Sequence, residues 1–293
     1  MERLTVFTPA YNRAYCLPRA YEALKKQSNK DFIWMIVDDG STDNTRQLVQ
    51  SWQKEDCGFK IEYIYKENGG MHSAHNTAYD HIKTELNTCI DSDDILAEDA
   101  IRKILSFWDQ YGSDRYAGII GLDADFDGNV IGKGFDENLK TTTLTGYYAA
   151  GGLGDKKLVY RTEIINKYPR YPEFEGEKFV PLDYIYCLCD REYELLVLPE
   201  VLCNVEYQAD GSSKNMFRQY YKNPNGFAFV RKQHMLMRND PKYIFKENIH
   251  YVSSSIFSRN GRFLKESPKK LYTVLAIPFG ILLCIYIRLH VKE

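Results

Sequence analysis

Acidic side chains gather at two points of the chain, each directly after an apolar run. Asp38 and Asp39 follow FIWMIV, and Asp91, Asp93 and Asp94 follow LNTCI. Carboxylates this close repel one another unless a positive charge is nearby. Two carboxylates at i and i+2 can share Mg²⁺ or Mn²⁺ with diphosphate oxygens, because these ions prefer oxygen ligands and keep open positions. The second cluster therefore predicts a divalent metal site, with a capping or solvated acidic turn as the alternative.

The TPAYNR segment and the Asp38–Asp39 pair have side chains that suit a nucleotide. In TPAYNR, residues 8–13, the ring of Tyr11 can stack on a base and Pro9 stiffens the turn. A carboxylate after a buried strand, such as Asp39, can accept hydrogen bonds from a base N–H or from ribose hydroxyls. The following STDNT supplies N-cap residue types for a helix, but capping does not account for two adjacent aspartates.

The elements that position these groups alternate along the chain. Hydrophobic periodicity predicts strands at 3–8, 32–39, 61–66, 86–91 and 116–124, separated by helices near 14–27, 45–52, 70–83 and 101–108. This alternation predicts an α/β fold with parallel strands in a doubly wound sheet, whose ligands bind beyond the carboxyl ends of the strands. All three polar groups begin where a strand ends. Beyond residue 125 we expect a loop or hairpin, and at 141–155 a mobile Gly- and Thr-rich loop.

Composition narrows the class of protein. The 293 residues are 44% hydrophobic, which is enough for one large α/β domain with an appendage or for two domains. The net charge of −2 argues against a protein built mainly to bind nucleic acid. The seven cysteines form no C-x-x-C pair, so we expect core-lining thiols in a reducing cytosol. The first residues enter a strand without an apolar signal region, so we expect no cleaved secretory signal.

The C-terminal segment is expected to contact a membrane. Leu271–Ile287 is uncharged and largely apolar, and its flanks carry Lys269, Lys270, Arg288 and Lys292. Its length of about 26 Å falls short of the roughly 30 Å hydrocarbon core, and Pro278 and Gly280 should kink or split a helix there. We expect a marginal span or helices lying in the interface, with a buried terminal helix as the alternative. The basic and aromatic residues from Lys214 to Lys246 also suit anionic headgroups, although a solvated helical face explains them equally.

Four motifs together resemble the family 2 glycosyltransferases, which have the GT-A fold. They are TPAYNR at 8–13, VDDGSTDNT at 37–45, ENGGMHSAHN at 67–76 and DSDD at 91–94. The resemblance covers roughly the first third of the chain and weakens after residue 125. It implies a GT-A-like, doubly wound mixed sheet flanked by helices. We expect a nucleotide-sugar-binding and catalytic domain at 1–210, then a C-terminal helical tail at 211–293 that associates with membrane through about 269–292.

The resemblance also implies roles for single residues. The nucleotide-sugar site would comprise Pro9, Ala10, Tyr11, Asn12, Asp38, Asp39, Gly69, Gly70, His72, Asn76, Asp91 and Ser92. Asp93 would be the direct metal ligand, with Asp91 near the ribose or acting as a second ligand. Met71 stands where many members carry Lys, and His75 where many carry Arg, which removes two side chains that could contact phosphate. For His72, helix capping or simple exposure is the alternative.

The resemblance further implies an inverting reaction, which needs a general base to deprotonate the acceptor hydroxyl. Asp183 opens an apolar helix-like run upstream of LPEVL and is the expected base. Leu182 stands where relatives often show an acid, so Glu177 and Glu175 are the reserve candidates. An N-cap role is the alternative for Asp183, and a solvated loop position is the alternative for both glutamates.

The sequence therefore predicts a metal-dependent glycosyltransferase that uses a nucleoside-diphosphate sugar, expected to be a UDP-sugar, and Mn²⁺ or Mg²⁺. Its acceptor would be the hydroxyl of a glycan, expected to be lipid-linked, in bacterial surface-polysaccharide assembly. It would work in the cytoplasm at the inner face of the cell membrane. Two other classes stay open: a non-catalytic nucleotide-sugar-binding module and a metal-dependent phosphotransferase.

Overall fold

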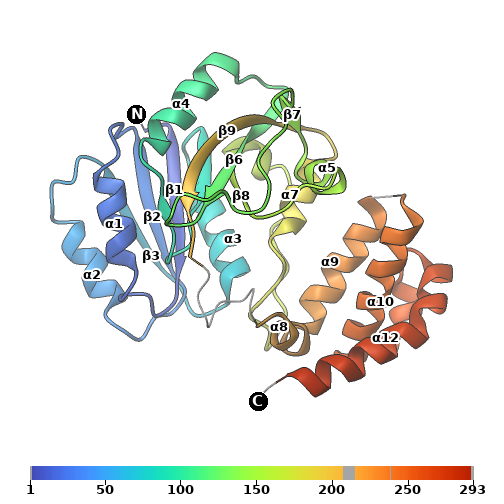
Figure 1. Ribbon diagram of the computed structural model, residues 1–293. Helices are drawn as coiled ribbons and strands as arrows, with labels where there is room; N and C mark the ends of the chain where they lie inside the picture. The colour runs from blue at the N-terminus through green and yellow to red at the C-terminus, as the bar shows by residue number, and fades with distance from the viewer. Residues whose placement is uncertain (1, 207–214, 238, 292–293) are drawn as a thin grey trace. The chain divides into compact units, whose positions relative to one another are not determined.

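The computed structural model describes residues 2–206, 215–237 and 239–291, so Lys214, Arg238 and Lys292 of the basic stretches lie outside the described residues. The chain folds into two compact units (Figure 1). Unit 1 comprises Met1–Asn68, Ala74–Pro169 and Leu188–Glu206, and unit 2 comprises Gly69–Ser73, Arg170–Cys187 and Tyr207–Glu293. Arg170–Cys187 thus groups with the C-terminal helices, and the domain boundary near residue 210 stays a prediction.

Unit 1 is built on one mixed sheet. Its parallel half has the order β3-β2-β1-β4 and consists of β1 (Leu4–Ala10), β2 (Phe32–Asp38), β3 (Lys60–Tyr65) and β4 (Leu86–Cys89). β8 (Lys156–Arg161) then runs antiparallel to both β4 and β6 (Tyr116–Ala124). The far edge is made by β9 (Glu194–Asn204), β5 (Ile95–Leu96) and β7 (Thr141–Thr142). The predicted α/β fold with a mixed sheet is confirmed.

Helices cover this sheet where the periodicity predicts them. The predicted helices are α1 (Leu17–Lys25), α2 (Thr45–Trp52), α3 (Met71–His81) and α4 (Ala100–Tyr111). The chain also forms two short helices that the periodicity does not predict, α5 (Leu144–Ala149) and α6 (Thr162–Ile165). The apolar face of α4 is buried as expected, with Ile104 fully inaccessible to solvent. On the sheet, Trp34 is completely buried and Tyr21 stacks on Trp52 with ring centroids 4.4 Å apart. Burial on both faces explains why β2 is a continuous apolar run.

One segment expected to be a loop forms a short strand and a short helix. The segment 141–155, predicted as a mobile loop, contains β7 and α5. Leu144 and Tyr147 of α5 are buried, and the Asp190 carboxylate accepts the first N–H groups of the helix, from Leu144 at 3.1 Å and Thr145 at 2.7 Å. This tertiary cap stabilises a short helix that local propensity does not reveal. The hairpin alternative near residue 125 is confirmed by a bridge between Ala124 and Val130.

Unit 2 is helical. Beside α7 (Asp183–Cys189), which begins in this unit, it contains α8 (Met216–Lys222), α9 (Pro224–Met237), α10 (Pro241–Phe257), α11 (Phe263–Glu266) and α12 (Lys270–His290). By length and composition α12 could cross a membrane, and no other helix among the described residues passes that test. The expected split at Pro278 is wrong, because α12 continues through it. Pro278 lies on the exposed side, where its missing N–H does not disturb the packed face.

Candidate active site

The carboxyl ends of β1, β2 and β4 bring three predicted clusters to one edge of the sheet. Ala10 pairs with Asp38 across the first two strands, and the backbone N–H of Asp39 donates to the Ala10 carbonyl oxygen at 2.8 Å. On the other side, the N–H of Ile90 donates to the Phe7 carbonyl oxygen at 3.0 Å. Parallel pairing therefore juxtaposes the loops that carry the expected base, ribose and metal contacts.

Asp38 and Asp39 are both buried, with 1% and 4% of their surfaces exposed. Asp38 accepts hydrogen bonds from the Ser41 N–H at 2.8 Å and from the Tyr63 hydroxyl. Burial, followed by the hydrogen bond to Asp38, raises the pKa of Tyr63. This agrees with the supporting role expected of Asp38.

Asp39 is held by two side chains from the segment after β3. Lys66 Nζ lies 2.8 Å from one carboxylate oxygen, and the Asn68 amide donates to the other at 3.1 Å. These contacts fix the Asp39 carboxylate at the carboxyl end of β2.

Asn12 joins two of the loops. Its backbone is left-handed, with φ of 54°, and its side-chain oxygen accepts the N–H groups of Thr42 at 2.8 Å and Asp43 at 3.3 Å. The Asn12 side chain therefore positions the loop after β2. Of its neighbours, Pro9 is half-buried and Ala10 is buried, whereas Tyr11 is 49% exposed and presents an aromatic ring to solvent.

Burial raises the pKa of two carboxyl groups in the acidic cluster after β4, those of Asp91 and Asp94. Solvent reaches the Asp91 side chain. Partial desolvation by the surrounding protein nevertheless raises the pKa of Asp91, and repulsion from Asp93 adds to this increase. Burial, followed by the repulsion of Asp91, raises the pKa of Asp94 to about 7. Asp94 also accepts the Glu206 N–H at 3.2 Å. Ser92, between the two motif aspartates, is buried.

Lys157 of β8 is the counter-charge that the sequence reasoning missed. It is 8% exposed, and its Nζ donates to the Cys89 carbonyl oxygen at 2.8 Å. Burial would lower the pKa of Lys157, but its neighbours, Cys203 first and then Asp123 and Asp94, raise it. Lys157 in turn opposes the pKa increases of Asp91 and Asp94. The available signal was the pair Lys156–Lys157 directly before the apolar run LVY of β8.

Asp123 is a second missed residue, at the end of β6. It lies two residues beyond Gly121, the β6 residue that pairs with Lys157, and only 4% of it is exposed. Burial raises the pKa of Asp123 to about 6, against the attraction of Lys157. Its Oδ1 is buried without a hydrogen-bond partner among the described residues. The positive charge of Lys157 therefore lowers the pKa of acids at the carboxyl ends of both β4 and β6.

The glycine- and histidine-containing segment is packed into the protein. Gly70 has φ of +93°, and a Cβ there would lie 1.9 Å from the Lys178 carbonyl oxygen, so only glycine fits. His72 is 1% exposed, which excludes the simple exposure considered for it. His75 is also buried, and its ring lies 5.0 Å from that of Phe7. Gly69, Gly70 and His72 belong to unit 2 and Asn76 to unit 1.

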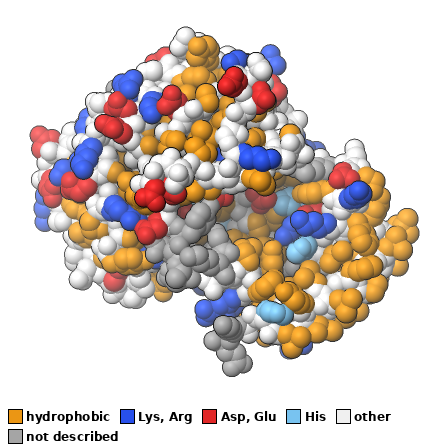
Figure 2. Space-filling view, viewed as in Figure 1, with side chains coloured by type: hydrophobic (Ala, Val, Ile, Leu, Met, Phe, Trp, Pro, Cys, Tyr) orange, Lys and Arg blue, Asp and Glu red, His pale blue; other side chains and the backbone are white. Residues whose placement is uncertain are grey.

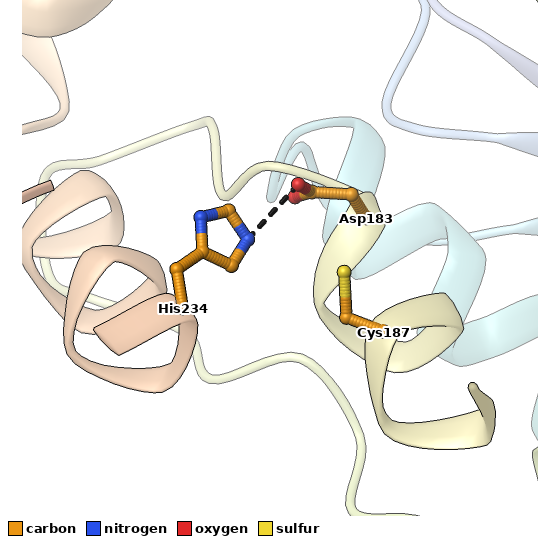
Figure 3. A group of neighbouring side chains, drawn as sticks. All are labelled: Asp183, Cys187 and His234. Carbon is orange, nitrogen blue, oxygen red and sulfur yellow. Dashed lines mark ion pairs between the residues drawn. The ribbon is translucent and has the colours of Figure 1, made fainter. Parts of the chain in front are cut away.

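The expected base, Asp183, meets a histidine from another helix of unit 2. Asp183 Oδ2 lies 3.0 Å from His234 Nε2, and the Asp183 side chain is 43% exposed (Figure 3). The contact is an ion pair. Asp183 Oδ1, the other carboxylate oxygen, and His234 Nε2 are buried, and neither has a hydrogen-bond partner among the described residues. Cys187, one turn along α7, completes a group whose polar atoms lie within 4.8 Å of one another.

The far side of His234 is also paired. Its Nδ1 lies 3.1 Å from Glu247 Oε2, and Arg231 donates to both oxygens of Glu247 at 3.1 and 2.9 Å. Burial would lower the pKa of His234, but Asp183, Cys187 and Glu247 together raise it to about 12. The imidazole is paired on both sides, so Arg231, Glu247, His234 and Asp183 form a continuous chain of ion pairs.

The reserve glutamates occupy different positions. Glu177 is buried, and its carboxylate accepts three N–H groups at the start of α9, from the Asn225 backbone and side chain and from the Gly226 backbone, each at 2.8 Å. Such a carboxylate stabilises the helix N-terminus. Glu175 is exposed. Of the three candidates for the general base, Asp183 is the one that forms an ion pair with His234.

Comparison with known proteins places these features in a family. The model of the family described as "Glycosyl transferase family 2" matches residues 5–150, which include all three clusters at the sheet edge. The chain belongs to the family 2 glycosyltransferases. The resemblance of the four motifs is thereby confirmed, and the protein is a glycosyltransferase.

Curated relatives of this glycosyltransferase differ in how much of the chain they match. A GalNAc(5)-diNAcBac-PP-undecaprenol beta-1,3-glucosyltransferase of Campylobacter jejuni is 23% identical over 94% of this chain and 89% of its own length. Glycosyltransferase GlyG of Streptococcus pneumoniae is 33% identical, over 35% of this chain and 34% of that protein. The second match therefore covers about a third of each protein.

Solved structures support the GT-A fold of this glycosyltransferase. Staphylococcus aureus TarS residues 1–349, in complex with UDP-GlcNAc, superposes with a TM-score of 0.65 at 19% identity, covering 95% of this chain and 80% of TarS 1–349. The mannosyltransferase PcManGT of Pyrobaculum calidifontis, with GDP-Man and Mn²⁺, gives 0.57 at 14% identity, covering 99% and 76%.

The donor set of this glycosyltransferase fits a hard divalent cation. Asp91 and Asp93 offer carboxylate oxygens, the ligands preferred by Mn²⁺ and Mg²⁺, and solvent reaches Asp91. Asp123 contributes a buried carboxylate oxygen without a hydrogen-bond partner among the described residues. The residues present are thus compatible with the predicted metal.

Proposed function

We propose that the protein transfers a sugar from a UDP-sugar to a hydroxyl of a lipid-linked glycan, with inversion at the anomeric carbon. The carrying observation is the convergence of exposed Tyr11, buried Asp39 and the Asp91–Asp93 pair at one sheet edge. This arrangement offers a stacking ring, a base-facing carboxylate and oxygen ligands for a cation that accompanies a diphosphate.

In the donor site, Tyr11 stacks on uracil and Asp39 accepts its ring N–H, while Asp38 keeps the loop in place through Ser41. Asp91 faces the ribose and, with Asp93, holds the metal. The metal supplies neutralisation of the charge that develops on the departing diphosphate. Lys157 favours the charged form of the surrounding carboxyl groups, since it opposes the burial that raises the pKa of Asp91 and Asp94.

In the acceptor step, Asp183 takes the proton of the attacking hydroxyl. The acceptor oxygen forms a bond to the anomeric carbon as the bond to the UDP oxygen breaks on the opposite side, which inverts the configuration. His234, held by Glu247, fixes the orientation of Asp183. A base held in one orientation is more effective because less reorganisation precedes proton transfer.

The lipid-linked acceptor is supported by the Campylobacter relative, whose name specifies a substrate linked to undecaprenol through a diphosphate. This relative matches nearly the whole chain. The apolar helix α12 is compatible with an enzyme that acts at the cytoplasmic face of a membrane in polysaccharide assembly. The UDP-sugar donor is supported by the fold shared with the UDP-GlcNAc-bound TarS.

The first test is calorimetric titration of the full chain with UDP, with and without Mn²⁺, beside Asp93→Asn. We expect UDP binding that requires the metal and is lost in the variant. UDP-sugar consumption should then rise when an undecaprenol-linked glycan is added. If UDP, GDP and dTDP all fail to bind with metal present, the transferase proposal is wrong for this chain.

A further inference from the structure

Helix α12 has two different faces along its whole length. Its buried face consists of mostly small residues three to four positions apart, namely Thr273, Ala276, Gly280, Cys284 and Ile287. The opposite side exposes large apolar side chains with the same period, and we call six of them the α12 stripe: Leu271, Leu275, Phe279, Leu282, Ile285 and Leu289. Side chains at this spacing share one face of a helix, so one side of α12 packs while the other is bare.

The buried side is held lengthwise against α10. A Cβ on Gly280 would lie 2.5 Å from Cγ1 of Val252, so the two helices approach closely at that point. Nearer the start of α12, the Thr273 hydroxyl donates to the buried side-chain oxygen of Asn248 at 2.5 Å. Separating the helices would take this donor away from the buried Asn248 side-chain oxygen, which is costly.

This packing decides between crossing a membrane and lying on it. A spanning α12 would either leave α10, exposing Thr273 and Asn248, or take α10 into the hydrocarbon with it. The second course would place Glu247 and the exposed Lys246 of α10 at membrane depth, where charged groups are costly. The stripe runs along the entire helix, about 32 Å for its 21 residues, so the whole length can contact a surface at once.

Charge around the stripe matches an anionic surface. Residues 241–290 carry eight Lys or Arg against two Asp or Glu, and of the two acids Glu247 is buried. Exposed Lys270 and Arg288 flank the stripe at its two ends. Figure 2 shows the hydrophobic expanse over α12 with basic side chains beside it. Two copies meeting through the stripe would bring like charges together, whereas anionic headgroups would neutralise them.

We propose that α12 binds an anionic lipid surface lengthwise, with the α12 stripe at the boundary between headgroups and acyl chains and with Lys270 and Arg288 on the headgroups. The helix lies parallel to the membrane and does not cross it. The binding of α12 to lipid determines the location of the enzyme and not its reaction. Vesicle binding without nucleotide or sugar measures it, so its failure leaves the transferase proposal untouched.

Flotation of the full chain with vesicles tests the surface. Binding should be at least about tenfold stronger with phosphatidylcholine–phosphatidylglycerol vesicles than with phosphatidylcholine alone, and should weaken in high salt. Leu275→Glu with Leu282→Glu should abolish flotation while circular dichroism and UDP binding are retained. Leu153→Glu in unit 1 is the matched control, since Leu153 and Leu275 are 55% and 56% exposed, and it should float like the unaltered chain. Undiminished flotation of the double variant overturns the proposal.

Tryptophan depth tests the orientation. Leu271→Trp, Leu282→Trp and Leu289→Trp place probes along the stripe, while the native tryptophans Trp34, Trp52 and Trp108 lie in unit 1 and give a constant background. Quenching by lipids brominated at different depths should report one shallow depth for all three probes. A deep Leu282→Trp probe with shallow ends would mean a span. Self-association in lipid-free solution that Leu275→Glu abolishes would assign the stripe to a second copy. Either result overturns the proposal.

Discussion

Asp183 Oδ2 lies 3.0 Å from His234 Nε2, and the other nitrogen of the same imidazole lies 3.1 Å from Glu247. A buried histidine thus connects the expected base on α7 to a buried carboxylate on α10. Raising the pKa of His234 to about 12 keeps the ring charged at neutral pH. A cation held beside a carboxylate favours its ionised form, which is the form that a general base needs.

Asp183→Asn should reduce kcat by about 10²- to 10⁴-fold, because the amide cannot take the hydroxyl proton. UDP affinity should stay unchanged, since Tyr11, Asp39 and the Asp91–Asp93 pair, which are expected to bind UDP and its metal, lie on unit 1. Steady-state kinetics with calorimetry separates the two effects. Unchanged kcat in this variant would falsify the assignment of the base.

His234→Gln should alter the pH dependence of stability. The His234 pKa is raised above its value of about 6.5 in the unfolded chain, so the stabilisation is fully present below pH 6.5 and is lost as the pH rises toward 12. The free energy of unfolding should fall by up to about 1.4 kcal/mol per pH unit above pH 6.5. Urea unfolding at several pH values measures this slope, which the variant should flatten. Identical slopes would show that the pair carries no net stabilisation.

Lys157→Met should weaken metal-dependent UDP binding by about tenfold or more, because Asp91 and Asp94 lose the cation that opposes their neutralisation. The loss should be greatest at the pH values where these carboxyl groups are protonated in the variant and still charged in the unaltered protein. Lys156→Met is the matched control: Lys156 is equally buried, at 8%, but its Nζ contacts backbone carbonyls such as that of Leu153. Equal effects of both variants would contradict a specific role for Lys157.

Glu177→Gln should destabilise the fold by about 1–3 kcal/mol, because the charged acceptor of three N–H groups at the start of α9 becomes a neutral amide. Activity per folded molecule should persist below the melting temperature. Exposed Glu175→Gln should leave stability unchanged. A large loss of kcat with normal stability in Glu177→Gln would instead make Glu177 the base.

The sequence by itself determined the parallel half of the sheet and the place of the donor site. Continuous apolar strands and an amphipathic α4 are local patterns, and the carboxyl ends of parallel neighbours must share one edge. Asp39, Asp91 and Asp93 could therefore be grouped before any coordinates. The apolar character of Leu271–Ile287 was equally readable.

Only the tertiary structure decided which groups from distant segments meet. Lys157 reaches the acidic cluster because β8 is inserted antiparallel between β4 and β6, a register that no local pattern encodes. His234 meets Asp183 because α9 and α7 pack in one unit, and α5 forms because Asp190 caps it from far along the chain. The bare stripe of α12 likewise depends on α10 covering the other side. Periodicity determines which face of an element is apolar, whereas the choice of partner for that face is a property of the packed chain.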